Sequence, residues 1–180
     1  MAVDYFTKCA EAEALSEIST ANIENFVWQN IISMFGVPQK IVTDNSTQFE
    51  SQRFKTFCED LAITKSLSAV VQPQANEHVE AVNKIIKHTL KAKLEGKKEA
   101  YADKLPKVLW SYRTTTRSTT RETPFSMVYG TEAMIPAESI ASMHRRATFN
   151  SEQNKDLLAA SLDLIEERRD AAHLKVVVYQ

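Results

Sequence analysis

Residues 35–49 have the sequence FGVPQKIVTDNSTQF, and this stretch decides the fold class. Gly36 and Pro38 end a preceding helical pattern, and the apolar run KIVT at 40–43 predicts a short buried strand. The strand ends at Asp44, so a carboxylate is expected at the carboxyl end of a strand. Strands that alternate with helices along the chain predict a mixed α/β fold.

Amphipathic patterns flank this strand on both sides. Before it, apolar residues recur every fourth position from Ile23 to Phe35, Trp28 lies alongside them in the expected core, and Ser19 and Thr20 are candidate N-caps. The expected strands lie at 2–5, 8–15, 40–43 and 63–67, and the further expected helices lie at 51–61, 76–94, from about 102 to 112, 124–130 and 150–175.

The composition excludes several function classes. The 180 residues include only three glycines, none close to another, so neither a glycine-rich dinucleotide loop nor a phosphate-binding nucleotide loop is present. Cys9 and Cys58 are expected as free thiols, and the four histidines share no metal spacing. No apolar stretch approaches the roughly 20 residues that span a bilayer, so we expect an intracellular protein without a membrane partner.

The charge is segregated along the chain. Residues 1–60 hold four basic and nine acidic side chains, residues 61–130 hold twelve and six, and residues 131–180 hold six and eight. The net charges are therefore −5, +6 and −2. A basic segment can be a solvated helix face or can follow the phosphates of a nucleic acid, and charge alone leaves both interpretations open.

Two carboxylates stand out because of their expected positions. Asp44 ends a strand and Glu80 lies in the first turns of a helix, with 35 residues between them. Such acids can converge on one hard cation, since Mg²⁺ takes few protein carboxylates and fills its shell with water and phosphate oxygens. Most acids are simply solvated, however, so the pair alone does not decide.

The helix of Glu80 also carries a row of lysines: Lys84, Lys87 and Lys91. At about 100° per residue, these lysines and Glu80 fall within about 60° of one another, and Asn83 flanks them. The row could lie along a phosphate backbone. Alternatively, Glu80 and Lys84 could form an ordinary i,i+4 ion pair.

Five segments resemble the catalytic core of gypsy-type long-terminal-repeat retrotransposon integrases, close to those of plants. They are VDYFTKCAEAEAL at 3–15, FGVPQKIVTDNSTQF at 35–49, QPQANEHVEAVNKIIK at 72–87, LWSYRTTTRSTTRETPF at 109–125 and SMVYGTEAMIP at 126–136. The resemblance implies a ribonuclease H-like fold, with a mixed central sheet flanked by helices and a long C-terminal helix. It also implies a two-metal polynucleotidyl transferase that processes element ends and joins them to target DNA.

The resemblance also implies site residues and partners. Asp44 matches the family's second acid and Glu80 its third, and both are expected to be catalytic and to bind Mg²⁺ or Mn²⁺. Together with the lysine row, the resemblance assigns DNA binding to Asn45, Gln74, Asn76, Asn83, Lys84, Lys87 and Lys91. We further expect a nuclear homodimer that binds element-end and target DNA and takes no small-molecule substrate.

The family's first catalytic Asp lies on a strand before the VDYFTK segment, so we expect that strand to be missing here. Asp4 is rejected as its substitute because it is expected near a hairpin turn. Single positions also depart from the family, which usually has Gly, His, Gly and Trp at the positions of Ser46, Gln72, Glu77 and Cys9.

These departures predict an integrase core over 1–137 that is catalytically incomplete and inactive as given, a pseudoenzyme from a polyprotein. A linker and an amphipathic helix are expected over 138–180. The alternative is a non-catalytic DNA-binding or dimerisation module derived from an integrase, and a third reading is a product with no stable folded role.

Overall fold

The computed structural model describes four stretches of the chain, residues 1–67, 73–94, 101–133 and 150–179. The chain folds as two units, of which the first comprises Met1–Tyr5 with Ala10–Leu109 and the second Phe6–Cys9 with Trp110–Gln180. The predicted boundary at 137–138 falls outside the described residues and stays a prediction.

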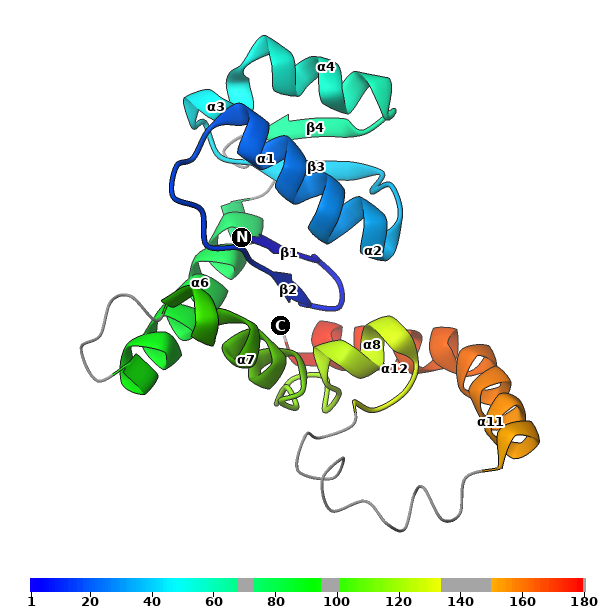
Figure 1. Ribbon diagram of the computed structural model, residues 1–180. Coiled ribbons are helices and arrows are strands. Elements are labelled where there is room, and N and C mark those ends of the chain that lie inside the picture. Colours follow the sequence, from blue (N-terminus) through cyan, green and yellow to red (C-terminus); the bar gives the residue numbers. More distant parts are fainter. Residues whose placement is uncertain (68–72, 95–100, 134–149, 180) are drawn as a thin grey trace. The chain divides into compact units, whose positions relative to one another are not determined.

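The strands of the first unit pair in two separate sheets (Figure 1). β1 (Ala2–Val3) and β2 (Ala10–Glu11) form an antiparallel hairpin. β3 (Lys40–Thr43) and β4 (Thr64–Leu67) run parallel to each other. The four strands thus lie within the predicted segments, but the described residues form two two-stranded sheets, whereas the fold class predicts one central sheet. Since β1 and β2 are only two residues long, each offers few main-chain groups for a further ladder.

A continuous helical segment precedes β3 and consists of α1 (Thr20–Phe26), the π-helix η1 (Val27–Ile32) and α2 (Ser33–Phe35). The predicted cap is confirmed, because the hydroxyl of Ser19 accepts a hydrogen bond from the main-chain N–H of Asn22 at 3.3 Å. The segment ends at Gly36, whose φ of 84° suits glycine.

The π-helical turns change which side chains face the core. Trp28 is 51% exposed, so its predicted burial is wrong. A π-helix is wider than an α-helix, so it shifts the register of the apolar face. The hydroxyl of Ser33 donates to the carbonyl oxygen of Trp28 at 2.8 Å and supports this wide turn.

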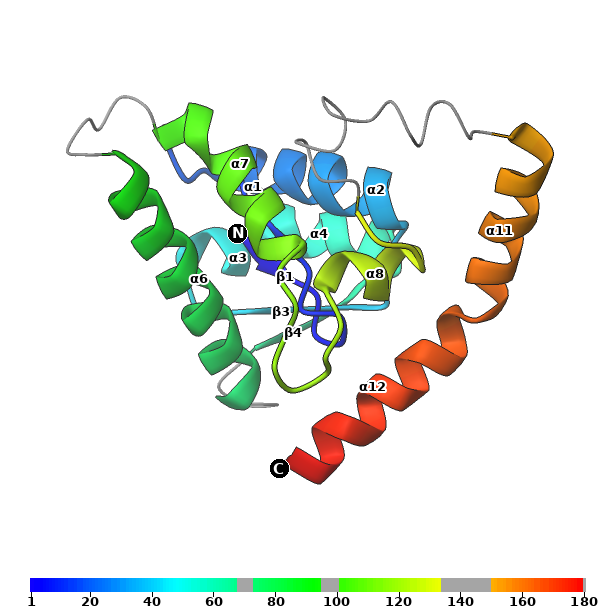
Figure 2. The ribbon, with the colours of Figure 1, turned by 90° about the horizontal axis from the view of Figure 1, so that it is seen from below.

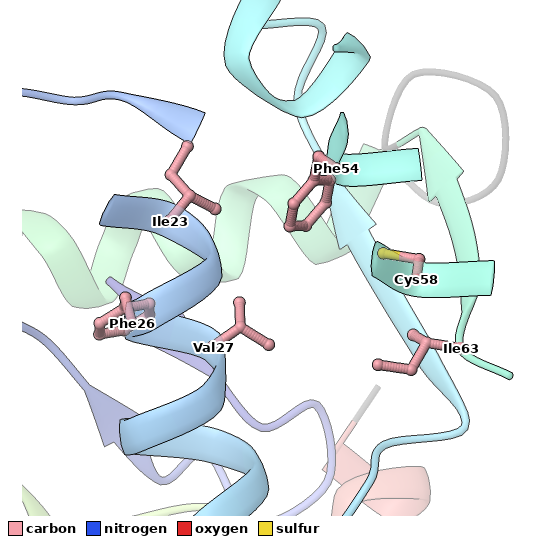
Figure 3. Packing of buried hydrophobic residues seen from close by; sticks show 6 residues of the cluster. All are labelled: Ile23, Phe26, Val27, Phe54, Cys58 and Ile63. Carbon is pink, nitrogen blue, oxygen red and sulfur yellow. The ribbon is translucent and has the colours of Figure 1, made fainter. Parts of the chain in front are cut away.

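The core of the first unit lies between this helical segment and α4 (Gln52–Asp60) (Figure 3). Phe54 is fully buried and Cys58 is a buried free thiol. The six buried members are Ile23, Phe26, Val27, Phe54, Cys58 and Ile63. The predicted apolar stripes of the two helices therefore face each other.

Three more helices follow β3 in the chain, namely α3 (Thr47–Glu50), α6 (Pro73–Leu94) and α7 (Tyr101–Arg113), and α7 ends within the second unit. The short α3 is not predicted by the pattern. α6 begins three residues before the expected start, at Pro73, because proline is well tolerated in the first turn of a helix.

The second unit contains α8 (Pro124–Tyr129), α11 (Ser151–Asp163) and α12 (Ile165–Tyr179). α8 has the predicted limits: Thr123 forms a capping box with Ser126, and Gly130 adopts the left-handed conformation.

The predicted long C-terminal segment is helical, but it is divided at Leu164 into two helices, α11 and α12 (Figure 2). Arg168 donates to the carbonyl oxygen of Gly130 and Arg169 to that of Met127, each at 3.0 Å. These bonds hold α12 against the end of α8. The direction of α12 is therefore set by contacts that α11 does not make. Among the described residues, no helix is both long and apolar enough to cross a membrane.

Candidate nucleic-acid interface and acid pair

Asp44 directly follows β3 at the carboxyl end of the strand, as predicted. Thr43 is buried whereas Asp44 is exposed, which agrees with the alternation of side chains along a strand. The Oδ1 atom of Asp44 accepts a hydrogen bond from the main-chain N–H of Ser46 at 3.0 Å, and Asn45 is also exposed. The turn therefore orients the carboxylate toward solvent.

The segment after this turn is tied to the neighbouring strand. Glu50 of α3 forms ion pairs with Lys65 of β4 and with Lys55 of α4, the latter at 3.3 Å. The hydrogen bond from Lys65, followed by that from Lys55, lowers the pKa of the Glu50 carboxyl. Because Lys65 pairs with Ile41 of β3, the Glu50–Lys65 ion pair links α3 to the sheet that ends at Asp44.

α6 has a buried apolar face and an exposed charged face. Val82, Ile86 and Leu90 are buried, as the apolar stripe predicts. Exposed charged residues occupy the other side, namely Glu80, Lys84, Lys87 and Lys91. Within residues 79–92, whose side chains are described, none of the three lysines forms an ion pair with another described residue. The positive face of α6 is therefore open to an anionic ligand.

The remaining predicted DNA contacts lie on the same helix. Asn83 is half-buried beside the lysines. Gln74 and Asn76 lie in the first turns of α6, and their side chains are outside the described part of the chain, as is Gln72. Their roles stay predictions.

Asp4 follows β1 and precedes the turn at residues 5–7, which is the position expected from the hairpin. The described residues contain no group of three or more His, Cys, Asp or Glu side chains that could hold a metal ion. Asp4 therefore does not complete a three-acid site with Asp44 and Glu80. The convergence of Asp44 and Glu80 on one cation stays a prediction.

Sequence reasoning misses one feature of the second unit. Within the Thr/Ser/Arg stretch at 114–123, Arg117–Glu122 forms a closed turn. The signal in the sequence is the repeat of arginine at every fourth position, Arg113, Arg117 and Arg121, with hydroxyl residues between them.

Comparison with known proteins gives consistent relatives. The family model described as Integrase core domain matches residues 1–73. The Transposon Tf2-3 polyprotein of Schizosaccharomyces pombe (strain 972 / ATCC 24843) is 26% identical over 152 residues. This alignment covers 84% of the chain but only 11% of the polyprotein, so the chain spans about a tenth of that relative's length.

Solved structures show the same likeness. The catalytic core domain of HTLV-2 integrase in complex with magnesium, in its trimeric form, has a TM-score of 0.60 and 25% identity. That comparison covers 70% of this chain and 80% of the other. The dimeric form of the same domain has a TM-score of 0.57 and 26% identity, and covers 68% of this chain and 78% of the other.

Proposed function

We propose that this chain, which resembles the integrase catalytic cores of gypsy-type long-terminal-repeat retrotransposons, binds DNA in the reactions of DNA integration. The binding surface is the positive face of α6, formed by Lys84, Lys87 and Lys91. Element-end and target DNA are the ligands.

The exposure of these three lysines is the observation that carries the proposal. Their aliphatic stems leave the helix opposite the buried Val82, Ile86 and Leu90, so the ammonium groups are available to solvent. An ammonium group that neutralises a phosphate releases a condensed counterion, which makes the affinity fall steeply with salt. Asn45, Gln74, Asn76 and Asn83 supply further polar contacts to the DNA backbone.

Mg²⁺ or Mn²⁺ fits the chemistry of the two predicted donors, Asp44 and Glu80. Asp44 and Glu80 are exposed carboxylates and would hold the ion, and the bond from Ser46 to Oδ1 of Asp44 leaves Oδ2 for a ligand. When bound, the ion would neutralise charge on the phosphate oxygens. Asp44 and Glu80 would hold this ion, and the lysines of α6 bind the phosphates of the strand.

A non-catalytic DNA-binding or dimerisation module is the second candidate function. It needs only the exposed lysines of α6, which can neutralise DNA phosphates without a reacting group. We further propose a homodimer with a nuclear location, an integrase core over 1–137, and a linker and helix over 138–180.

The test of DNA binding is fluorescence anisotropy of a labelled duplex titrated at several KCl concentrations. The Lys84→Ala plus Lys87→Ala variant should lower the slope of log K against log salt by about 1.8, that is, about 0.9 for each lost contact. The matched control, Lys107→Ala plus Lys155→Ala, removes the same charge from exposed positions on α7 and α11. Equal slopes for the two double variants would refute the assignment to α6.

A strand-transfer assay with pre-processed element ends and a target plasmid separates the two candidate functions. We expect salt-sensitive binding without joining in either metal. Metal-dependent joining that Asp44→Asn abolishes would contradict the non-catalytic alternative. Sedimentation velocity of the same preparation tests the homodimer, and a monomer at micromolar concentration would contradict it.

A further inference from the structure

The Arg117–Glu122 turn of the second unit is closed by its own main chain. The N–H of Arg117 donates to the carbonyl oxygen of Glu122 at 2.9 Å, and the N–H of Arg121 donates to the carbonyl oxygen of Arg117 at 2.8 Å. The N–H of Glu122 donates to the hydroxyl of Thr120 at 3.2 Å. The turn is therefore ordered before any ligand arrives.

Side chains anchor the turn at two points. The guanidinium carbon of Arg117 lies 3.9 Å from the centre of the Tyr112 ring, and its Nη2 donates to the carbonyl oxygen of Tyr112 at 3.4 Å. On α12, the ammonium group of Lys175 donates to the carbonyl oxygen of Thr120 at 3.1 Å. The turn is thus fixed to the end of α7 and to α12.

The residues at the tip of the turn are polar and exposed, namely Ser118, Thr119 and Arg121. Within the described part of the second unit, no hydrogen bond or ion pair engages the guanidinium of Arg121. Glu122, the one acid in residues 113–122, instead accepts a hydrogen bond from the hydroxyl of Ser126 at 3.1 Å. The tip consequently presents a cation and two hydroxyls without an apolar side chain.

The backbone of Arg121 is unusual for its residue type. Its φ is 59°, in the left-handed region where glycine and asparagine are favoured and arginine is not. Strained positions cluster at functional sites, and here the strain sits on the residue with the unengaged guanidinium. Glycine at this position would suit the backbone better but would remove the charge.

We infer that this turn is a second duplex DNA contact, in which Arg121, Ser118 and Thr119 bind the phosphodiester backbone. The inference rests on the proposed function of DNA binding and extends it to the second unit. Guanidinium groups bind phosphate oxygens in a bidentate manner, and Ser and Thr hydroxyls are common phosphate donors in DNA complexes. A turn that is already ordered loses little conformational entropy when it binds.

A phosphate contact explains the composition of the tip better than a protein or lipid partner. Protein interfaces depend on a few large buried anchors, and lipid surfaces need apolar side chains to insert. Ser118, Thr119 and Arg121 offer neither. The turn also lies in the segment 61–130, whose net charge is +6.

The experiment compares Arg121→Gly with Arg121→Lys in the full chain, with the same labelled duplex and KCl series. Arg121→Gly should weaken binding about eight-fold at 0.1 M salt and lower the salt slope by about 0.9, since one phosphate contact is lost. Arg121→Lys keeps the charge and should keep the slope. The Tm of Arg121→Gly should equal or exceed that of the parent chain, so that weaker binding is not a result of unfolding.

Three results would overturn the inference. The first is an unchanged affinity and slope for Arg121→Gly in a chain that binds the duplex. The second is a weaker affinity of Arg121→Gly with an unchanged salt slope, which would show that no phosphate contact was lost. The third is displacement of the duplex by polyglutamate only from the parent chain and not from Arg121→Gly, which would point to an acidic peptide. Lys84→Ala plus Lys87→Ala, measured in parallel, reports on the proposed function separately.

Discussion

The hydroxyl of Ser51 joins three elements of the first unit, and its removal should cost far more than an ordinary serine substitution. Its Oγ accepts a hydrogen bond from the N–H of Phe54 at 3.3 Å, which caps α4. It also accepts from the hydroxyl of Thr20 on α1 at 3.2 Å and donates to the carbonyl oxygen of Gln48 on α3 at 2.8 Å. Ser51→Ala removes all three bonds at once.

The magnitude follows from these contacts. Loss of an N-cap side chain costs about 1 kcal/mol. Loss of the bond to Thr20 adds about 1 kcal/mol, because that hydroxyl keeps only a longer bond of 3.4 Å to the carbonyl oxygen of Gln48. The free energy of unfolding should therefore fall by about 2 kcal/mol, which corresponds to a decrease of about 4–8 °C in Tm for a protein of this size.

The chain offers a matched control five residues earlier. Ser46 occupies the N-cap position of α3, with a similar extended backbone, but its side chain makes no capping hydrogen bond. Urea denaturation of Ser46→Ala should show a change within about 0.5 kcal/mol. Equal destabilisation by Ser46→Ala and Ser51→Ala would refute the reasoning. So would additive effects of Ser51→Ala and Thr20→Val, because bonded partners should couple.

Two further predictions concern the core of the first unit. Phe54→Ala should lower the free energy of unfolding by about 3–5 kcal/mol, because Phe54 is 0% exposed. The control Met34→Ala, at a side chain that is 59% exposed, should change this free energy by about 0.5 kcal/mol or less in the same urea experiment. Similar values for the two variants would contradict the assigned core. Burial raises the pKa of the Cys58 thiol, so the native state keeps this proton at a pH where the unfolded chain loses it. Stability should therefore fall as the pH rises above about 8.5, and Cys58→Ala should show a shallower alkaline decline; parallel curves for the two proteins would argue against this linkage.

Local signals in the sequence predict much of the fold correctly. Ser19 caps its helix, Thr123 and Gly130 bound α8, and KIVT forms β3. Each of these outcomes depends on a side chain and its immediate neighbours, or on the steric freedom of glycine. The residues that interact here are close together in the chain, so the sequence alone is enough to predict the interaction.

The features that the sequence does not predict depend on distant contacts. The π-helix that exposes Trp28 needs a register set by packing, and the break at Leu164 reflects bonds from α12 to the end of α8. The Arg117–Glu122 turn is anchored by Lys175, 55 residues from its acceptor in the chain. The same holds for the candidate acid pair. Its spacing in the sequence predicts that Asp44 lies at a strand end and Glu80 on a helix face, but it does not predict the distance between them.

The two proposed DNA contacts lie in different units, and this arrangement has a thermodynamic consequence. If the α6 face and the Arg117–Glu122 turn engage one duplex, the second contact is intramolecular, and the slopes lost in the separate variants add in the combined one. If each contact engages its own duplex, only the tighter contact determines the salt slope at low DNA concentration. Removal of the weaker contact then leaves the salt slope unchanged. The salt slope of the combined Lys84→Ala, Lys87→Ala and Arg121→Gly variant therefore measures whether the two units act on the same DNA. A loss of about 2.7 relative to the parent chain would mean that they do.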